Sequence, residues 1–85
     1  MSVTATLDIV VRALAAQAGV AESSVDPEKP LSAVPGIESV KALRAITDIE
    51  DECDVVIPDD FLFETATVRE LADFVAKLTR EGSSI

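Results

Sequence analysis

Ser39 is the residue whose type and position point most directly to chemistry. It follows a stretch rich in proline and glycine, stands next to Glu38, and opens a second helical pattern. Unpaired backbone amides and the positive end of the helix dipole favour an attached phosphate at such a position. A serine there is also a good N-cap, which stabilises a helix by about 1 kcal/mol. Position alone favours the cap, and it leaves phosphate attachment open.

A run of carboxylates is the second candidate. Seven of them and no basic residue lie between Asp48 and Asp60: Asp48, Glu50, Asp51, Glu52, Asp54, Asp59 and Asp60. A calcium loop would need glycine where Cys53 stands. Alternate residues on a helix also point about 200° apart, so they do not converge on one ion. An EF-hand is therefore excluded, and the run is either a solvated helix face or a charged docking surface.

Cys53 is the only cysteine, and it falls on the apolar side of the second helical pattern. The chain contains no histidine that would lower the pKa of its thiol. We therefore expect Cys53 to be a core residue and not a nucleophile.

The composition limits the classes of function. The 85 residues include 7 basic and 16 acidic side chains, which give a formal charge of −9. This charge disfavours nucleic acid and anionic lipid as partners and favours basic protein surfaces. From the sequence we expect neither a transmembrane segment nor a secretory signal, and a single cysteine suits a reducing compartment. We expect a monomeric cytoplasmic helper protein without a catalytic or metal site of its own.

The helical patterns define the elements that position these residues. Apolar residues recur every three or four positions from Val3 to Ala18, and Gly19 provides the stop. Residues 19–38 contain three prolines and lose the periodicity, but their scattered apolar side chains indicate an ordered crossover loop. Those side chains are Val20, Val25, Leu31, Val34 and Ile37.

A second helix is expected between Gly36 and Asp54, with a buried face marked by Leu43, Ile46, Ile49 or Glu50, and Cys53. Residues 55–57 then form a buried connector, and a short helical turn carries Phe61–Phe63. The pattern Thr67-x-x-Glu70 is a capping box that opens the last helix. The sequence therefore predicts an all-α fold: three main helices and one short helix in a small bundle. The single domain spans residues 1–85, with a flexible tail at about 81–85.

The order of these elements resembles an acyl carrier protein over essentially the whole chain. The family's attachment signature reads Gly36-Ile37-Glu38-Ser39-Val40 here, and Ile57-Pro58-Asp59 and Thr67-Val68 add to the likeness. The resemblance implies that Ser39 receives 4′-phosphopantetheine from coenzyme A. The thiol of this arm would hold acyl intermediates as thioesters.

The resemblance also implies the partners. They are a phosphopantetheinyl transferase, which would supply the attachment chemistry, and the acyl-loading and condensing enzymes. The residues expected to dock them lie around the attachment serine and along the second helix: Glu38, Val40, Lys41, Arg44, Asp48 and Asp51.

Several residues depart from the family pattern. Glu38 replaces the usual aspartate, Val40 a leucine or methionine, Pro35 a leucine, and Cys53 a position that is commonly aromatic. Lys41 and Arg44 interrupt a helix that is mostly acidic in fatty-acid carriers, which favours a specialised polyketide or mixed peptide–polyketide pathway. Two alternatives stay open: a peptidyl carrier, although Ile37 stands where a second glycine is usual, and an unmodified helical adaptor.

Overall fold

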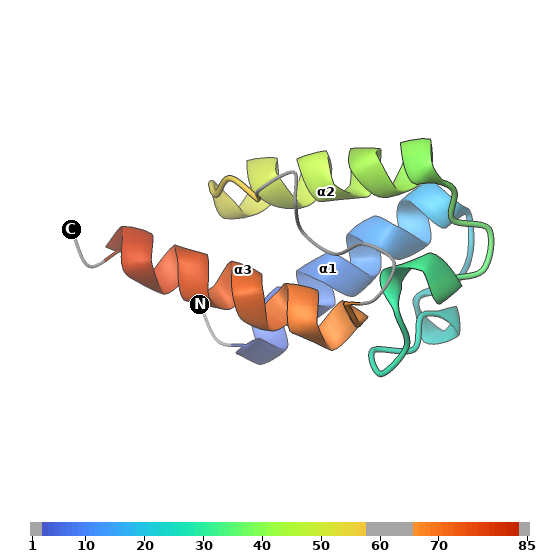
Figure 1. The fold of residues 1–85 in the computed structure, drawn as a ribbon, viewed down its shortest axis with the longest axis horizontal. Helices are drawn as coiled ribbons and strands as arrows, with labels where there is room; N and C mark the ends of the chain where they lie inside the picture. Colours follow the sequence, from blue (N-terminus) through green and yellow to red (C-terminus); the bar gives the residue numbers. More distant parts are fainter. Residues whose placement is uncertain (1–2, 58–65, 84–85) are drawn as a thin grey trace.

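The computed structural model describes residues 3–57 and 66–83. Three helices dominate it: α1 at Val3–Ala18, α2 at Ser39–Cys53 and α3 at Val68–Ser83 (Figure 1). Two short 3-10 turns, Glu22–Ser24 and Leu31–Ala33, lie in the loop between α1 and α2. The prediction of an all-α fold with three main helices is confirmed. The short helix expected at Phe61–Phe63 lies outside the described residues.

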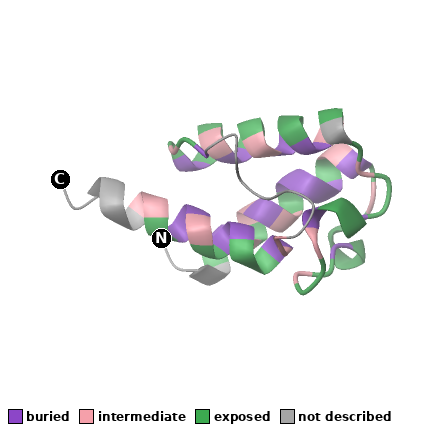
Figure 2. Ribbon diagram, in the orientation of Figure 1, coloured by how far each residue is buried: buried purple, intermediate pink, exposed green. Residues whose placement is uncertain are grey.

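Helix α1 packs against both α2 and α3. Its buried residues include Val10, Leu14 and Ala18, which are spaced four apart and therefore lie on one face. Figure 2 shows that buried residues line the facing sides of the three helices. The helix ends at Gly19, whose φ of +75° is the left-handed conformation of a C-terminal cap and whose amide donates to the Ala15 carbonyl at 2.9 Å.

The buried face of α2 differs in one respect from the sequence-based expectation. Its buried residues are Ala42, Ala45, Ile49 and Cys53. Leu43, which we expected in the core, is 64% exposed, so that prediction is wrong. Leu43 lies about 100° around the helix from Ala42, and the alanines face α1 because small residues let two helices approach closely.

Glu50 organises the end of α2. Asp54 caps the helix with a φ of 55°, and the amides of Asp54 and Val55 both donate to the Glu50 carbonyl. The Glu50 carboxylate accepts a further bond from the Ile57 amide at 2.7 Å. In the extended segment that follows, Ile57 is buried but Val56 is 80% exposed, because alternate residues of an extended chain face opposite sides. The expectation of a fully buried connector is wrong at Val56.

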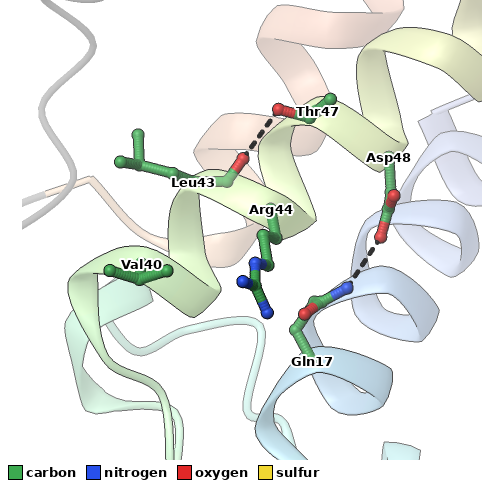
Figure 3. Close-up of a pocket in the computed structure, with 6 residues that line it drawn as sticks. All are labelled: Gln17, Val40, Leu43, Arg44, Thr47 and Asp48. Atoms are coloured by element: carbon green, nitrogen blue, oxygen red, sulfur yellow. Dashed lines mark hydrogen bonds between the residues drawn. The ribbon is translucent and has the colours of Figure 1, made fainter.

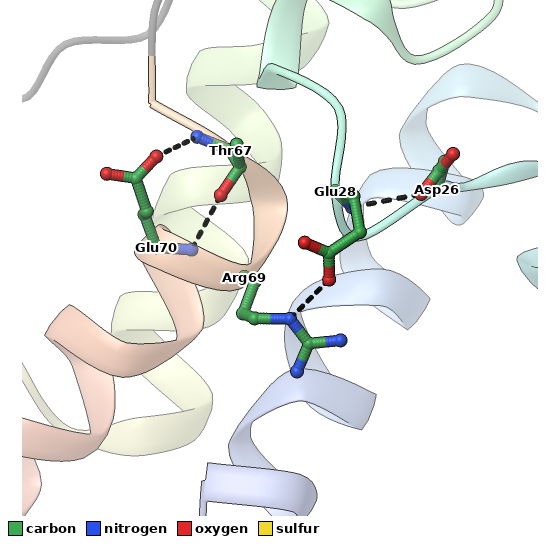
Figure 4. A network of polar contacts seen from close by, with 5 residues as sticks. All are labelled: Asp26, Glu28, Thr67, Arg69 and Glu70. Atoms are coloured by element: carbon green, nitrogen blue, oxygen red, sulfur yellow. Dashed lines mark hydrogen bonds and ion pairs between the residues drawn. The ribbon is translucent and has the colours of Figure 1, made fainter.

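The start of α3 carries the predicted capping box. The Glu70 amide donates to the Thr67 hydroxyl and the Thr67 amide donates to the Glu70 carboxylate, each at 3.0 Å (Figure 4). Two amides of the first turn are thereby satisfied. Helix α3 continues to Ser83 and so includes the first residues of the expected tail, whose flexibility stays a prediction.

The long loop is ordered, as predicted, because it is bonded to the start of α3. The Leu31 amide donates to the Ala66 carbonyl at 3.0 Å, and the Val68 amide donates to the Lys29 carbonyl at 3.1 Å. Arg69 pairs with the Glu28 carboxylate at 2.5 Å (Figure 4). The loop side chains Val25, Leu31 and Val34 are buried beneath these contacts. The loop is therefore anchored to the start of α3 at residues 28–31, ahead of the segment that leads to α2.

Candidate functional site

Gly36 places the loop at the start of α2. Its φ is +79°, which side chains other than glycine rarely adopt. A Cβ at this position would also lie 2.9 Å from the backbone oxygen of Ala18, so the loop rests directly on the last residue of α1. The Ile37 amide then donates to the Val34 carbonyl at 3.1 Å. The glycine is therefore required for both conformation and space, three residues before Ser39.

Ser39 is the first residue of α2, and the N-cap position belongs to Glu38. Glu38 has the extended backbone of a cap, with φ −122° and ψ 166°, and its carbonyl accepts the Ala42 amide at 2.8 Å. The hypothesis that Ser39 is the N-cap is therefore wrong, since the helix begins at Ser39 itself, one residue earlier than capping by Ser39 requires. Helix capping does not account for a serine at this position.

The start of α2 has the chemistry that a phosphate group needs. The Glu38 side chain makes no capping hydrogen bond, and the first turn of the helix contains no acidic residue. The neighbouring residues Gly36, Glu38 and Val40 are exposed. Lys41 is close by, with its ammonium donating to the Gly36 carbonyl at 3.5 Å. First-turn amides, a helix dipole and a cation together fit a phosphodiester attached here.

A hollow of about 330 Å³ lies along the outer side of α2, next to this site. It is lined by Gln17 from α1 and by residues of α2: Val40, Leu43, Arg44, Thr47 and Asp48. In Figure 3, Arg44 points toward Gln17, whereas Leu43 projects away from it. Three predicted docking residues, Val40, Arg44 and Asp48, thus share one surface. The sequence analysis did not predict that Leu43 belongs to this surface. The spacing of Ala42, Ala45 and Ile49 also fits a buried helix face, and a face made of these residues leaves Leu43 exposed.

The carboxylates of α2 have different surroundings. Asp48 accepts a hydrogen bond from the Gln17 amide group at 3.0 Å, and Glu52 pairs with Arg12 of α1 at 3.6 Å. Asp51 is exposed, and it bonds to no other side chain in the part of the chain that the structure describes. Asp48 and Glu52 therefore help to hold α2 on α1. Asp51 is exposed to solvent and is free to contact a partner.

Cys53 and the carboxylates of α2 have surroundings that differ from those of a reactive thiol or a metal site. Cys53 is buried, as predicted, and burial raises the pKa of its thiol, with the charge of Glu52 adding to the effect. A raised pKa keeps the thiol neutral and unreactive. Residues 48–53 are helical, and residues 3–57 and 66–83 contain no group of three side chains placed to hold a metal ion.

Comparison with known proteins identifies the family of the chain. Residues 8–75 match the family described as "Phosphopantetheine attachment site". The acyl carrier protein of Chlorobium phaeovibrioides is 30% identical over 70 residues, covering 82% of this chain and 90% of that protein, and the values for Chlorobium luteolum are the same. The acyl carrier protein of Chlorobium phaeobacteroides is 32% identical over 59 residues, or 69% of this chain and 76% of that protein.

No solved structure shows a significant match to this chain. None of the helices that the structure describes is long and apolar enough to cross a membrane.

Proposed function

Because this chain belongs to the acyl carrier protein family, whose covalent cofactor is 4′-phosphopantetheine, we propose that Ser39 is its attachment residue. One observation carries this assignment: Ser39 is the first residue of α2 and the N-cap position is already held by Glu38. The helix start offers uncapped first-turn amides and the Lys41 ammonium to the phosphodiester. The thiol at the end of the arm holds acyl groups as thioesters.

Attachment depends on a partner enzyme. The serine oxygen displaces 3′,5′-ADP from coenzyme A and forms the new phosphodiester. Since the chain has no histidine, the phosphopantetheinyl transferase has to accept the hydroxyl proton. The protein itself presents the serine, docks its partners and raises the effective concentration of the tethered acyl group at their active sites.

The proposed pathway is polyketide or mixed peptide–polyketide synthesis. Lys41 and Arg44 support this choice because they place positive charge on the first half of α2, where a partner that reads a continuous acidic strip would be repelled. The partners would then be the acyl-loading and condensing enzymes of that pathway. A peptidyl carrier is the second candidate, and mass spectrometry of the loaded arm distinguishes an acyl from an aminoacyl cargo.

Coexpression with a broad-specificity phosphopantetheinyl transferase tests the attachment. The intact mass of the wild type should rise by one phosphopantetheine group, and Ser39→Ala should gain nothing. Ser24→Ala is the matched control, since Ser24 is an exposed serine of the first 3-10 turn and should leave modification complete. Modification of the Ser39→Ala variant, or an unmodified wild type, would contradict the assignment.

The intact mass of protein purified from its native host separates a working carrier from an unmodified adaptor. If the protein is a working carrier, its mass should include a phosphopantetheine group or an acylated form of that group. An unmodified mass in the host, together with full modification by the coexpressed transferase, would favour the adaptor.

A further inference from the structure

The charges of α2 are segregated along the helix. In its first half, residues 39–47, the charged residues are Lys41 and Arg44, and in the second half they are Asp48, Glu50, Asp51 and Glu52. Acidic residues outnumber basic ones 16 to 7 in the whole chain, so two cations next to Ser39 oppose the overall charge. The charged side chains of α2 therefore change from basic in its first half to acidic in its second.

Arg44 has no carboxylate partner among the residues that the structure describes. Asp48 lies one turn further along α2, but its carboxylate is bonded to Gln17 at 3.0 Å. Arg44 is exposed and points toward the same Gln17 at the edge of the hollow (Figure 3). Its guanidinium is thus available to an external acceptor, and a carboxylate is the acceptor that matches its planar donors best.

Two apolar side chains adjoin this cation. Val40 is 58% exposed and Leu43 is 64% exposed, and both line the 330 Å³ hollow with Arg44. Val40 and Leu43 are close along α2 and border the same hollow, so together they offer a small apolar surface to a partner's apolar side chain. The site therefore combines an apolar contact with a cation, Arg44, that has no carboxylate partner among the described residues.

We propose that the partners reaching Ser39 dock on the first half of α2 with an amphipathic segment that carries a carboxylate. The segment places an apolar side chain against Val40 and Leu43 and its carboxylate on Arg44. This inference rests on the proposed function, because it names the partner surface of the same site. Arg44 selects against basic partner surfaces at this position, where like charges would meet.

The test uses two synthetic amphipathic helical peptides with the same leucine face, one flanked by glutamates and the other by lysines. Each is titrated into the full-length ¹⁵N-labelled protein, and the amide shifts of Val40, Leu43 and Arg44 are followed by NMR. The affinity derived from these amide shifts should be about fivefold higher for the glutamate peptide than for the lysine peptide. This is the difference expected for one exposed ion pair. The lysine peptide should act instead on the second half of α2.

Variants test whether Arg44 causes the preference for the glutamate peptide. Arg44→Glu should reverse the preference at these amides, and Arg44→Gln should abolish it. Lys77→Gln is the matched control, since it removes an exposed cation from α3 and should change nothing. The proposal is overturned if neither peptide shifts these amides, if the lysine peptide binds them as tightly, or if the preference survives in Arg44→Glu.

The peptide assay does not depend on attachment, so Ser39→Ala should bind like the wild type. A chain that binds the glutamate peptide but gains no phosphopantetheine would overturn the proposed function alone. A chain that is modified but shows no peptide preference would overturn only the docking inference.

Discussion

A side chain added at Gly36 would place its Cβ 2.9 Å from the backbone oxygen of Ala18. The loop that leads to Ser39 is thus held against the end of α1 by direct backbone contact. The atom in the way belongs to a backbone carbonyl, which cannot rotate aside as a side chain would. The position of the proposed attachment residue therefore depends on contact between segments that are 18 residues apart.

Gly36→Ala should lower the free energy of unfolding by about 2–4 kcal/mol, because left-handed strain and a backbone clash add. Gly19→Ala is the matched control, since Gly19 has a similar φ of +75° but nothing within 4 Å of the added Cβ. The Gly19→Ala variant should lose only about 1–2 kcal/mol of unfolding free energy. Urea unfolding followed by circular dichroism measures both, and equal losses would contradict the role of the Ala18 contact.

Glu50→Ala should destabilise the protein by about 1–3 kcal/mol, because the Ile57 amide loses its carboxylate acceptor next to a buried side chain. The exposed neighbour Asp51 provides the control, and Asp51→Ala should stay within about 0.5 kcal/mol of the wild type. Thermal or urea unfolding checks the pair. Equal stability of the two variants would show that Glu50 does not hold the connector.

Thr67→Ala should cost about 1 kcal/mol, because the Glu70 amide loses its capping hydroxyl. Thr67→Ser should keep most of the wild-type stability. Thr47→Ala serves as the comparison, since Thr47 is an exposed mid-helix residue whose hydroxyl bonds only its own helix at the Leu43 carbonyl. A loss in Thr47→Ala as large as in Thr67→Ala would argue against a specific cap.

Charge reversal separates docking from packing on the second half of α2. Asp51→Lys should leave unfolding unchanged but slow acyl transfer from the carrier's loading enzyme at low salt, an effect that added salt should reduce. Asp48→Lys should also lower stability by about 1 kcal/mol because it breaks the bond to Gln17. Transfer rates that are the same for Asp51→Lys and the wild type at every salt concentration would remove the electrostatic account.

Stability should fall as pH rises above the ordinary thiol pKa. The pKa of Cys53 is raised in the folded state, so the unfolded chain loses its thiol proton first and is favoured with rising pH until the folded pKa is reached. Unfolding free energies measured across this range should decline in the wild type. Cys53→Ala should decline less, and identical slopes would show that the thiol is not the group responsible.

Local sequence signals were sufficient for most of the fold. Gly19 ends α1 by its own conformational preference, and the Thr67-x-x-Glu70 spacing brings two side chains to the amides that need them. These features depend on residues within one helical turn. The resemblance likewise led to the family, which the comparisons show, because the signature and the element order lie along the chain. Ser39 as the attachment residue stays a proposal.

Only the tertiary structure decided which side of α2 is buried and which residues remain for partners. Leu43 and Ala42 are both apolar, and hydrophobicity alone favours the larger one for the core. The close approach of α1 buries the alanines and leaves Leu43 beside Val40 and Arg44. The carboxylates of Asp48 and Glu52 were similarly assigned by their neighbours on α1. The sequence by itself determined the helices and their ends, because those depend on near neighbours; the proposed docking face depends on how distant helices pack.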